Sequence, residues 1–281
     1  MKAASAVVIM ANALANAPTL TDDVRPWVKR FVRIGYVGKG IVYLLIGALA
    51  LQLALGEGGR VTDASGVLRT LEAQPFGVAL LIIVALGLLA YAGWEMARAV
   101  FDTRGKGSTA KGWLQRSPPI VKAVVHGALG VEAVRLVVGN PRRSQDAADV
   151  AATTMSFPLG GILFALVGVG IAIYGLLQIW RAWQFKFDDD LDQHLLRRDG
   201  AGWVLTIGRW GIGARGVIMT VMGLAIARAG FVRRPSEAAG ISESLWTVLA
   251  QPYGHWLLAA VAAGLVCFGV FQLLHARYAR L

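Results

Sequence analysis

Six apolar stretches dominate the sequence, and each is long enough to cross the hydrocarbon core of a membrane as a helix. They run from Ile34 to Leu55, Phe76 to Ala97, Ile120 to Gly139, Pro158 to Trp180, Ile207 to Gly230 and Tyr253 to Leu274. A spanning helix needs about 20 predominantly apolar residues, and all its backbone polar groups must bond within the segment. With 56% hydrophobic and 16% charged residues, the chain is expected to be an all-α integral membrane protein with six transmembrane helices.

The stretches repeat in pairs. In the first stretch of the pair, "RIGYVGKGIVYLLIG" (33–47) aligns with "RWGIGARGVIMTVMG" (209–223), and "VVHGALG" (124–130) supplies a shorter third copy. The second stretches share a Pro-x-Gly start, formed by Pro75 and Gly77, Pro158 and Gly160, and Pro252 and Gly254. The sequence therefore contains one two-helix unit three times.

These repeats predict the organisation of the whole chain. We expect a tail at 1–30, a first repeat at 31–101, a basic inner loop at 102–119, a second repeat at 120–183, a charged inner loop at 184–203 and a third repeat at 204–281. Because each unit crosses an even number of times, the repeats are parallel and related by an axis along the membrane normal. A bundle of six helices with pseudo-threefold symmetry follows.

The three helix pairs resemble the bacterial membrane family catalogued as domain of unknown function 1206. The resemblance covers roughly positions 31–279 and is carried by the basic residue followed by glycine in each first helix and by the Pro-x-Gly start of each second helix. The middle unit departs from the pattern, since it lacks the arginine and the early glycines of the other two. The resemblance implies an architecture and no particular activity.

The Pro-x-Gly motif is expected to be a structural turn. The preceding outer segments "DASGVLRTLEA" (63–73) and "SESLWTVLA" (242–250) are predicted to form short surface helices. Proline is tolerated in the first turn of a helix, so we expect each proline to lie at the first turn of its spanning helix, with the glycine relieving crowding at the bend.

Charge distribution predicts the orientation. The net charge is +11, but the basic residues alternate between the two sides of the expected membrane instead of forming one nucleic-acid-binding face. Most of them lie on the inner side if both termini are cytoplasmic, as the positive-inside rule requires. We therefore expect a multi-pass protein of the bacterial inner membrane. The first 17 residues resemble a signal peptide, although a retained tail agrees better with the charges.

Repeat alignment gathers the ionisable and amide side chains of the spans into two positions. The basic position is occupied by Lys39, His126 and Arg215, and the second position by Glu95, Gln178 and Gln272. We expect polar clamps within each unit, which would join Lys39 to Glu95, His126 to Gln178 and Arg215 to Gln272. The alternative is a basic ring that attracts an anion or an anionic lipid headgroup at the cytoplasmic face.

Glu132 has no counterpart in the other repeats. It lies inside the third stretch and shares that stretch with His126 and Arg135. A proton or ion relay through His126 and Glu132 is one interpretation, because ionisable residues inside a membrane often mark transport pathways. A local ion pair between Glu132 and Arg135, three residues apart, is the other.

No complete catalytic motif is present, so we expect no enzyme, no cofactor and no metal site. The acidic segment 188–199 has Gln193 where a calcium loop needs glycine, and Cys267 is the single cysteine. Two function classes remain. The first is an accessory membrane protein that binds lipid or a membrane complex, and the second is a channel or transporter for a proton, small ion or small solute along the pseudo-threefold axis.

Overall fold

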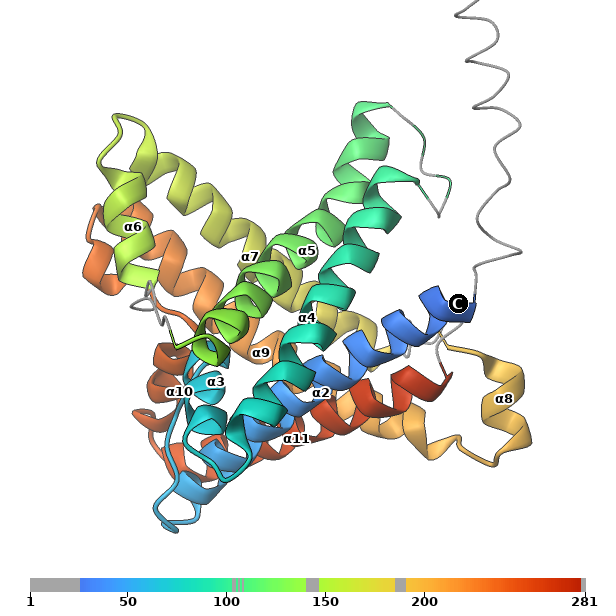
Figure 1. Cartoon of the computed structure of the whole chain (residues 1–281). Helices are drawn as coiled ribbons and strands as arrows, with labels where there is room; N and C mark the ends of the chain where they lie inside the picture. Colours follow the sequence, from blue (N-terminus) through green and yellow to red (C-terminus); the bar gives the residue numbers. More distant parts are fainter. Residues whose placement is uncertain are drawn as a thin grey trace, which may run out of the picture.

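The computed structural model describes residues 26–102, 105, 107, 109–139, 147–184 and 191–278. Its six long helices are α2 (Pro26–Ala54), α4 (Gly77–Val100), α5 (Ala110–Val137), α7 (Gly160–Trp183), α9 (Trp203–Val232) and α11 (Gly254–Tyr278) (Figure 1). The all-α class is therefore confirmed. The first 17 residues, which resemble a signal peptide but were expected to be retained, lie outside the described residues.

Five of the long helices are long and apolar enough to cross a membrane. These segments are Val32–Ala54, Gly77–Val100, Gly160–Trp183, Trp203–Val232 and Gly254–Tyr278. The apolar part of α5 differs because it carries Lys122, Glu132 and Arg135. The structure thus supports a membrane protein, and α5 is its most polar long helix.

The segments 102–119 and 184–203, predicted to be loops, contain more helix than the sequence predicted. Helix α5 begins at Ala110, inside the expected loop 102–119, although Pro118 and Pro119 lie within it. Arg116 stabilises this extension, because its Nε donates to the carbonyl oxygen of Ala99 over 2.6 Å and its Nη2 donates to that of Val100 over 2.8 Å. These carbonyls belong to the last turn of α4, where no backbone N–H of the same helix can reach them.

Two further boundaries differ for similar reasons. Helix α2 begins at Pro26, inside the expected tail, and proline favours the first helical position. The charged loop 184–203 contains α8 (Gln193–Arg198), whose N-cap Asp192 accepts hydrogen bonds from the backbone N–H groups of His194 and Leu195.

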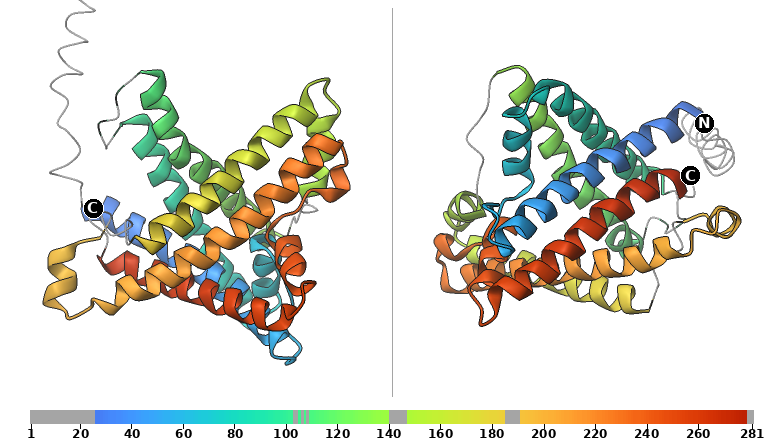
Figure 2. Two further views of the ribbon diagram at one scale, coloured as in Figure 1. Left: turned by 180° about the vertical axis from the view of Figure 1, so that it is seen from behind. Right: turned by 90° about the horizontal axis from the view of Figure 1, so that it is seen from below.

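Three pairs of long helices pack most closely, namely α4 with α5, α7 with α9, and α11 with α2. Each pair joins the second helix of one repeat to the first helix of the next, with the third repeat returning to the first. Within the repeats, α2 also packs on α4 and α9 on α11, whereas α5 and α7 are not among the closely packed pairs. Figure 2 shows the α4–α5 pair diverging from the α7–α9 pair.

The short helices α3 (Ala64–Glu72), α6 (Ala147–Met155) and α10 (Ile241–Leu249) lie at one end of the bundle, opposite α8 and the ends of the described chain (Figure 1). The two predicted surface helices, at 63–73 and 242–250, are therefore present as α3 and α10. Each short helix leads directly into a Pro-x-Gly turn.

The same turn is built three times, but its prolines precede the long helices instead of lying in their first turns. Helices α4, α7 and α11 begin at Gly77, Gly160 and Gly254. Each of these glycines donates its N–H to the carbonyl three residues before it, over 2.8 to 3.0 Å. A Cβ on Gly77 would lie 2.3 Å from the carbonyl oxygen of Leu71. The glycine is needed because the chain folds back onto the end of the short helix.

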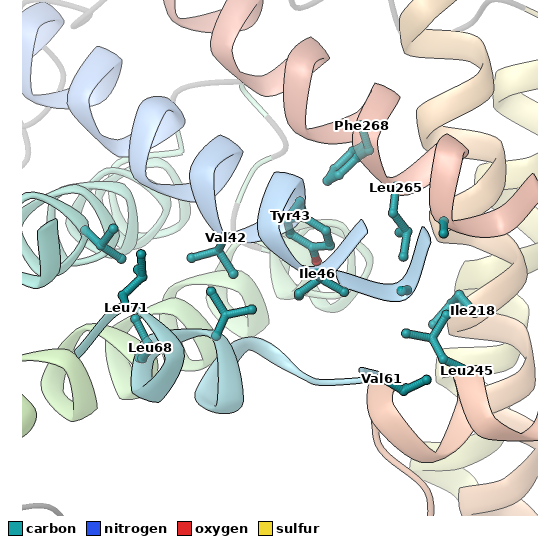
Figure 3. Packing of buried hydrophobic residues seen from close by; sticks show 14 of the residues in the cluster. Val42, Tyr43, Ile46, Val61, Leu68, Leu71, Ile218, Leu245, Leu265 and Phe268 are labelled. Carbon is teal, nitrogen blue, oxygen red and sulfur yellow. The ribbon is translucent and has the colours of Figure 1, made fainter. Parts of the chain in front are cut away.

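An apolar core fills the half of the bundle that adjoins the short helices. Figure 3 shows Val42 and Ile46 of α2 packed near Leu68 of α3, with Leu245 of α10 and Leu265 of α11 in the same cluster. Leu68, Leu245 and Leu265 are at most 1% exposed. The buried polar residues of α4, α7 and α11 lie further along these helices, toward the opposite end.

Candidate functional site, a buried polar cluster

Repeat-related glycines bring the helices close enough to gather the polar residues. A Cβ on Gly40 would lie 3.0 Å from the carbonyl oxygen of Gly269, and one on Gly216 would lie 2.8 Å from that of Gly175. At the third equivalent position, a Cβ on Gly127 would lie 3.6 Å from its nearest neighbour. Such close backbone approach is typical of helix contacts in membranes. Each glycine directly follows the basic residue of its repeat.

Aromatic side chains connect the three basic positions. Nζ of Lys39 lies 3.4 Å from the hydroxyl of Tyr91 and 5.4 Å from the ring centroid of Phe268. The ring of His126 lies 4.7 Å from that of Tyr91, and the guanidinium of Arg215 lies 5.4 Å from the Phe268 ring. Cations are attracted to such ring faces. The structure therefore brings Lys39, His126 and Arg215 into one region.

The hydrogen bonds of Arg215 go to residues of the other two repeats. Its Nη1 donates to Oε1 of Gln178 over 2.6 Å, and its Nε donates to the hydroxyl of Tyr43 over 3.1 Å. The expected bond to Gln272 is wrong, since Oε1 of Gln272 is buried without a hydrogen-bond partner. The reason is that α9 packs more closely on α7 than on α11.

Glu95 also interacts with the next repeat. Its Oε1 lies 3.8 Å from Nζ of Lys122 on α5 and 3.4 Å from Nη1 of Arg98 on α4. The expected direct pair with Lys39 is not among the described ion pairs. Similarly, Nδ1 of His126 lies 2.8 Å from the backbone carbonyl oxygen of Lys122, one turn earlier on α5, and not against Gln178.

Lys122 is the cluster member that sequence reasoning missed. It was not singled out in the sequence analysis, although its position in the repeat is that of Gly35 and Gly211. The repeat alignment could have identified it, because a lysine stands at a position where the other two repeats have glycine. We call Lys39, Glu95, Lys122, His126, Gln178, Arg215 and Gln272 the polar cluster.

The polar cluster carries an excess of positive charge. Lys39, Lys122 and Arg215 are basic, and Glu95 is its one carboxylate. Lys39 is 7% exposed and Glu95 is 1% exposed. Because charges removed from water require partners, this arrangement is suited to an added anion.

Glu132 lies apart from these contacts. No ion pair joins it to Arg135 in the described part of the chain, and its Oε1 is buried without a hydrogen-bond partner. The predicted Glu132–Arg135 pair is therefore not formed.

Comparisons with known proteins agree with the repeat structure. The model of the family described as Domain of Unknown Function (DUF1206) matches residues 34–102, 119–184 and 210–279. "Uncharacterized protein YxxB" of Bacillus subtilis (strain 168) is 29% identical over 259 residues, which cover 92% of this chain and 94% of that protein. No solved structure matches.

Proposed function

Since this chain belongs to the DUF1206 family and contains three copies of its unit, we propose that α5 crosses the membrane as the five other long helices do. Each matched segment holds two long helices. With 28 residues, α5 is about 42 Å long at 1.5 Å per residue. Lys122, a charged residue near the start of the apolar part of α5, pairs with Glu95 of α4 within the bundle.

The proposal includes a pseudo-threefold arrangement of the six helices. It is supported by the repeat-equivalent positions of Gly40, Gly127 and Gly216, each of which faces the second helix of the preceding repeat, closely at Gly40 and Gly216 and at an ordinary contact distance at Gly127. By the positive-inside rule, both termini lie on the cytoplasmic side of a bacterial inner membrane. The polar cluster then lies toward the cytoplasmic side.

For function, we propose an accessory membrane protein that binds an anionic lipid headgroup at the polar cluster. The observation that supports it is the excess of basic residues in the cluster, where the buried Lys39 and the partly buried Lys122 and Arg215 have Glu95 as the one carboxylate. A phosphate group would pair with these cations through charge-assisted hydrogen bonds. Nε2 of Gln178, a buried donor without a hydrogen-bond partner in the described structure, adds a further group suited to a phosphate oxygen.

The test compares anionic with zwitterionic lipid on the purified protein. We expect native mass spectrometry to detect phosphatidylglycerol retained by the wild type and not phosphatidylcholine at equal concentration. Arg215→Gln and Lys39→Gln should each weaken retention by about fivefold or more, because a basic residue near an anionic surface contributes about 1 kcal/mol. Arg33→Gln removes an exposed charge from α2 and should have little effect.

Equal retention of both lipids by the wild type would contradict headgroup binding. So would loss of binding in Arg33→Gln to the same extent as in Arg215→Gln, since that result indicates attraction by overall charge. Size-exclusion chromatography of each variant separates loss of lipid from loss of fold. Retention of a co-purified membrane protein in place of lipid would favour the membrane-complex form of the accessory function.

A second candidate function is a proton or small-ion pathway along the axis through Glu132 and His126. The buried, unpartnered Oε1 of Glu132 favours it. Glu132→Gln should abolish proton flux in liposomes while leaving the protein folded. Liposomes that show no flux above the lipid background in the wild type would remove this alternative.

A further inference from the structure

The contact between the two helices of one repeat differs among the three repeats. In the first repeat, a Cβ on Gly35 would lie 2.8 Å from Cβ of Tyr91, and one on Gly38 would lie 3.1 Å from Cα of Gly87. The third repeat is packed in the same way, because a Cβ on Gly211 would lie 2.5 Å from Cα of Phe268. Backbones of two helices thus touch in both outer repeats.

The second repeat leaves the equivalent surfaces uncovered. Gly170 of α7 corresponds to Gly87, but a Cβ there would meet nothing within 4 Å. Val167 is 50% exposed, whereas its equivalent in the first repeat, Val84, is 1% exposed. Val125 of α5, at the position of Gly38, is 49% exposed.

The substitutions in the second repeat explain the difference. Val125 and Lys122 stand where the first repeat has Gly38 and Gly35, so the side chains of α5 prevent the backbone contact that glycines permit. Lys122 instead extends to Glu95 of α4. We call the exposed surface formed by Val125, Val167 and Gly170 the α5–α7 opening.

Members of the polar cluster lie near the α5–α7 opening along both helices. Lys122 lies one turn before Val125 on α5, and its side chain is 34% exposed while it pairs with Glu95. On α7, Gln178 lies two turns after Gly170 and accepts a hydrogen bond from Arg215 of α9. Apolar side chains therefore border the opening, and Lys122 of α5 and Gln178 of α7, both members of the polar cluster, lie one to two helical turns away from it.

We propose that the α5–α7 opening is the lateral route by which the phosphate headgroup of an anionic phospholipid passes from the bilayer to the polar cluster. This inference rests on the proposed function. The charge of the cluster selects the occupant, since phosphate complements Lys122 and Arg215. The exposed apolar side chains at the borders of the opening suit the acyl chains of the same lipid. The first and third repeats offer no equivalent surface, because their two helices are in close contact there.

The test fills the opening without changing any charge. Gly170→Leu adds a side chain to the opening, and Gly93→Leu is the matched control on α4, where a Cβ also meets nothing within 4 Å. In native mass spectrometry with phosphatidylglycerol, we expect Gly170→Leu to reduce retention by about fivefold or more, comparable to loss of one basic contact. Gly93→Leu should bind as the wild type does.

The outcomes separate the route from the function. If Arg215→Gln loses lipid but Gly170→Leu and Gly93→Leu both retain it, the headgroup site stands and the lateral route is refuted. If the wild type itself does not prefer phosphatidylglycerol, the proposed function fails first, and the route with it.

A crosslinking measurement tests the occupant directly. A photoreactive phenylalanine in place of Val125, in protein reconstituted with phosphatidylglycerol, should yield a lipid adduct, and the same residue in place of Gly93 should yield less of it when bulk phosphatidylcholine is in excess. A covalent dimer at position 125 would show that a second copy of the chain covers the opening, and would overturn the proposal.

Discussion

Gly168 and Gly170 lie two residues apart on α7, and we expect substitution by alanine to affect the stability of the protein in opposite ways at the two positions. A Cβ on Gly168 would lie 2.2 Å from the backbone nitrogen of Ala227 and 2.8 Å from the carbonyl oxygen of Gly223, both on α9. Nonbonded heavy atoms attract at about 3.5 to 4.0 Å, so Gly168→Ala forces α7 and α9 apart by roughly 1 Å. Gly170→Ala meets open space.

The expected magnitude follows from these two environments. Overpacking of a close contact costs about 1 to 3 kcal/mol, and it acts on the most extensive helix contact of the bundle. Replacing glycine by alanine also favours the helix by about 0.5 to 1 kcal/mol, but this gain applies to both variants and cancels between them. Gly168→Ala should therefore be less stable than Gly170→Ala by about 1 to 3 kcal/mol.

Reversible unfolding of the purified protein in mixed micelles, followed by circular dichroism as the denaturing detergent increases, measures this difference. Equal midpoints for the two variants would refute the reasoning that α7 and α9 are in backbone contact. A lower stability of Gly170→Ala than of Gly168→Ala would mean that α7 presents its other face to α9.

Three further predictions concern single contacts. Gln178→Leu removes the acceptor of Arg215 and should lower the free energy of unfolding by about 1.5 to 3 kcal/mol in the same unfolding assay, as for other hydrogen bonds to charged groups. Arg116→Met removes the donor that closes the end of α4, and should increase amide hydrogen exchange in the last turn of that helix. Hydrogen bonding by Arg198, followed by other basic and hydroxyl donors, lowers the pKa of Asp199, which lies outside the spans. A carboxyl group whose pKa is lower in the folded state stabilises the fold at pH values above its unfolded pKa, and this stabilisation is lost as the pH falls through the folded pKa. Amide exchange at the end of α11 should therefore rise on acidification, and Asp199→Asn should remove that dependence.

The glycines illustrate how much of the fold the sequence could predict. The alignment of Gly40, Gly127 and Gly216 predicted that each repeat uses the same small position, and the structure places all three against a neighbouring helix. It could not tell which neighbour. A hairpin connection favours partners within one repeat, but the closest contacts are between repeats, because the small residues of α7 and α9 are spaced to match each other.

The polar residues show the same limit. Their depth followed from the alignment, and Lys39, His126 and Arg215 do meet through Tyr91 and Phe268. Their partners did not follow, since Arg215 binds Gln178 and not Gln272. The expected start of α5 was also too late, because a segment rich in prolines and basic residues is typical of a loop. The hydrogen bonds from Arg116 to the end of α4, which stabilise the helix there, could not be predicted from the sequence.

The sequence by itself determined that this protein is helical, apolar and built from one helix pair repeated three times. Helix length and depth depend on the number of residues along the axis, and these can be counted. The structure alone decided which faces meet, because the rotation of each helix and the choice of neighbour depend on the fit of side chains from distant segments. For this reason the open contact between α5 and α7, with Val125 and Lys122 where glycines close the other repeats, became visible only in three dimensions.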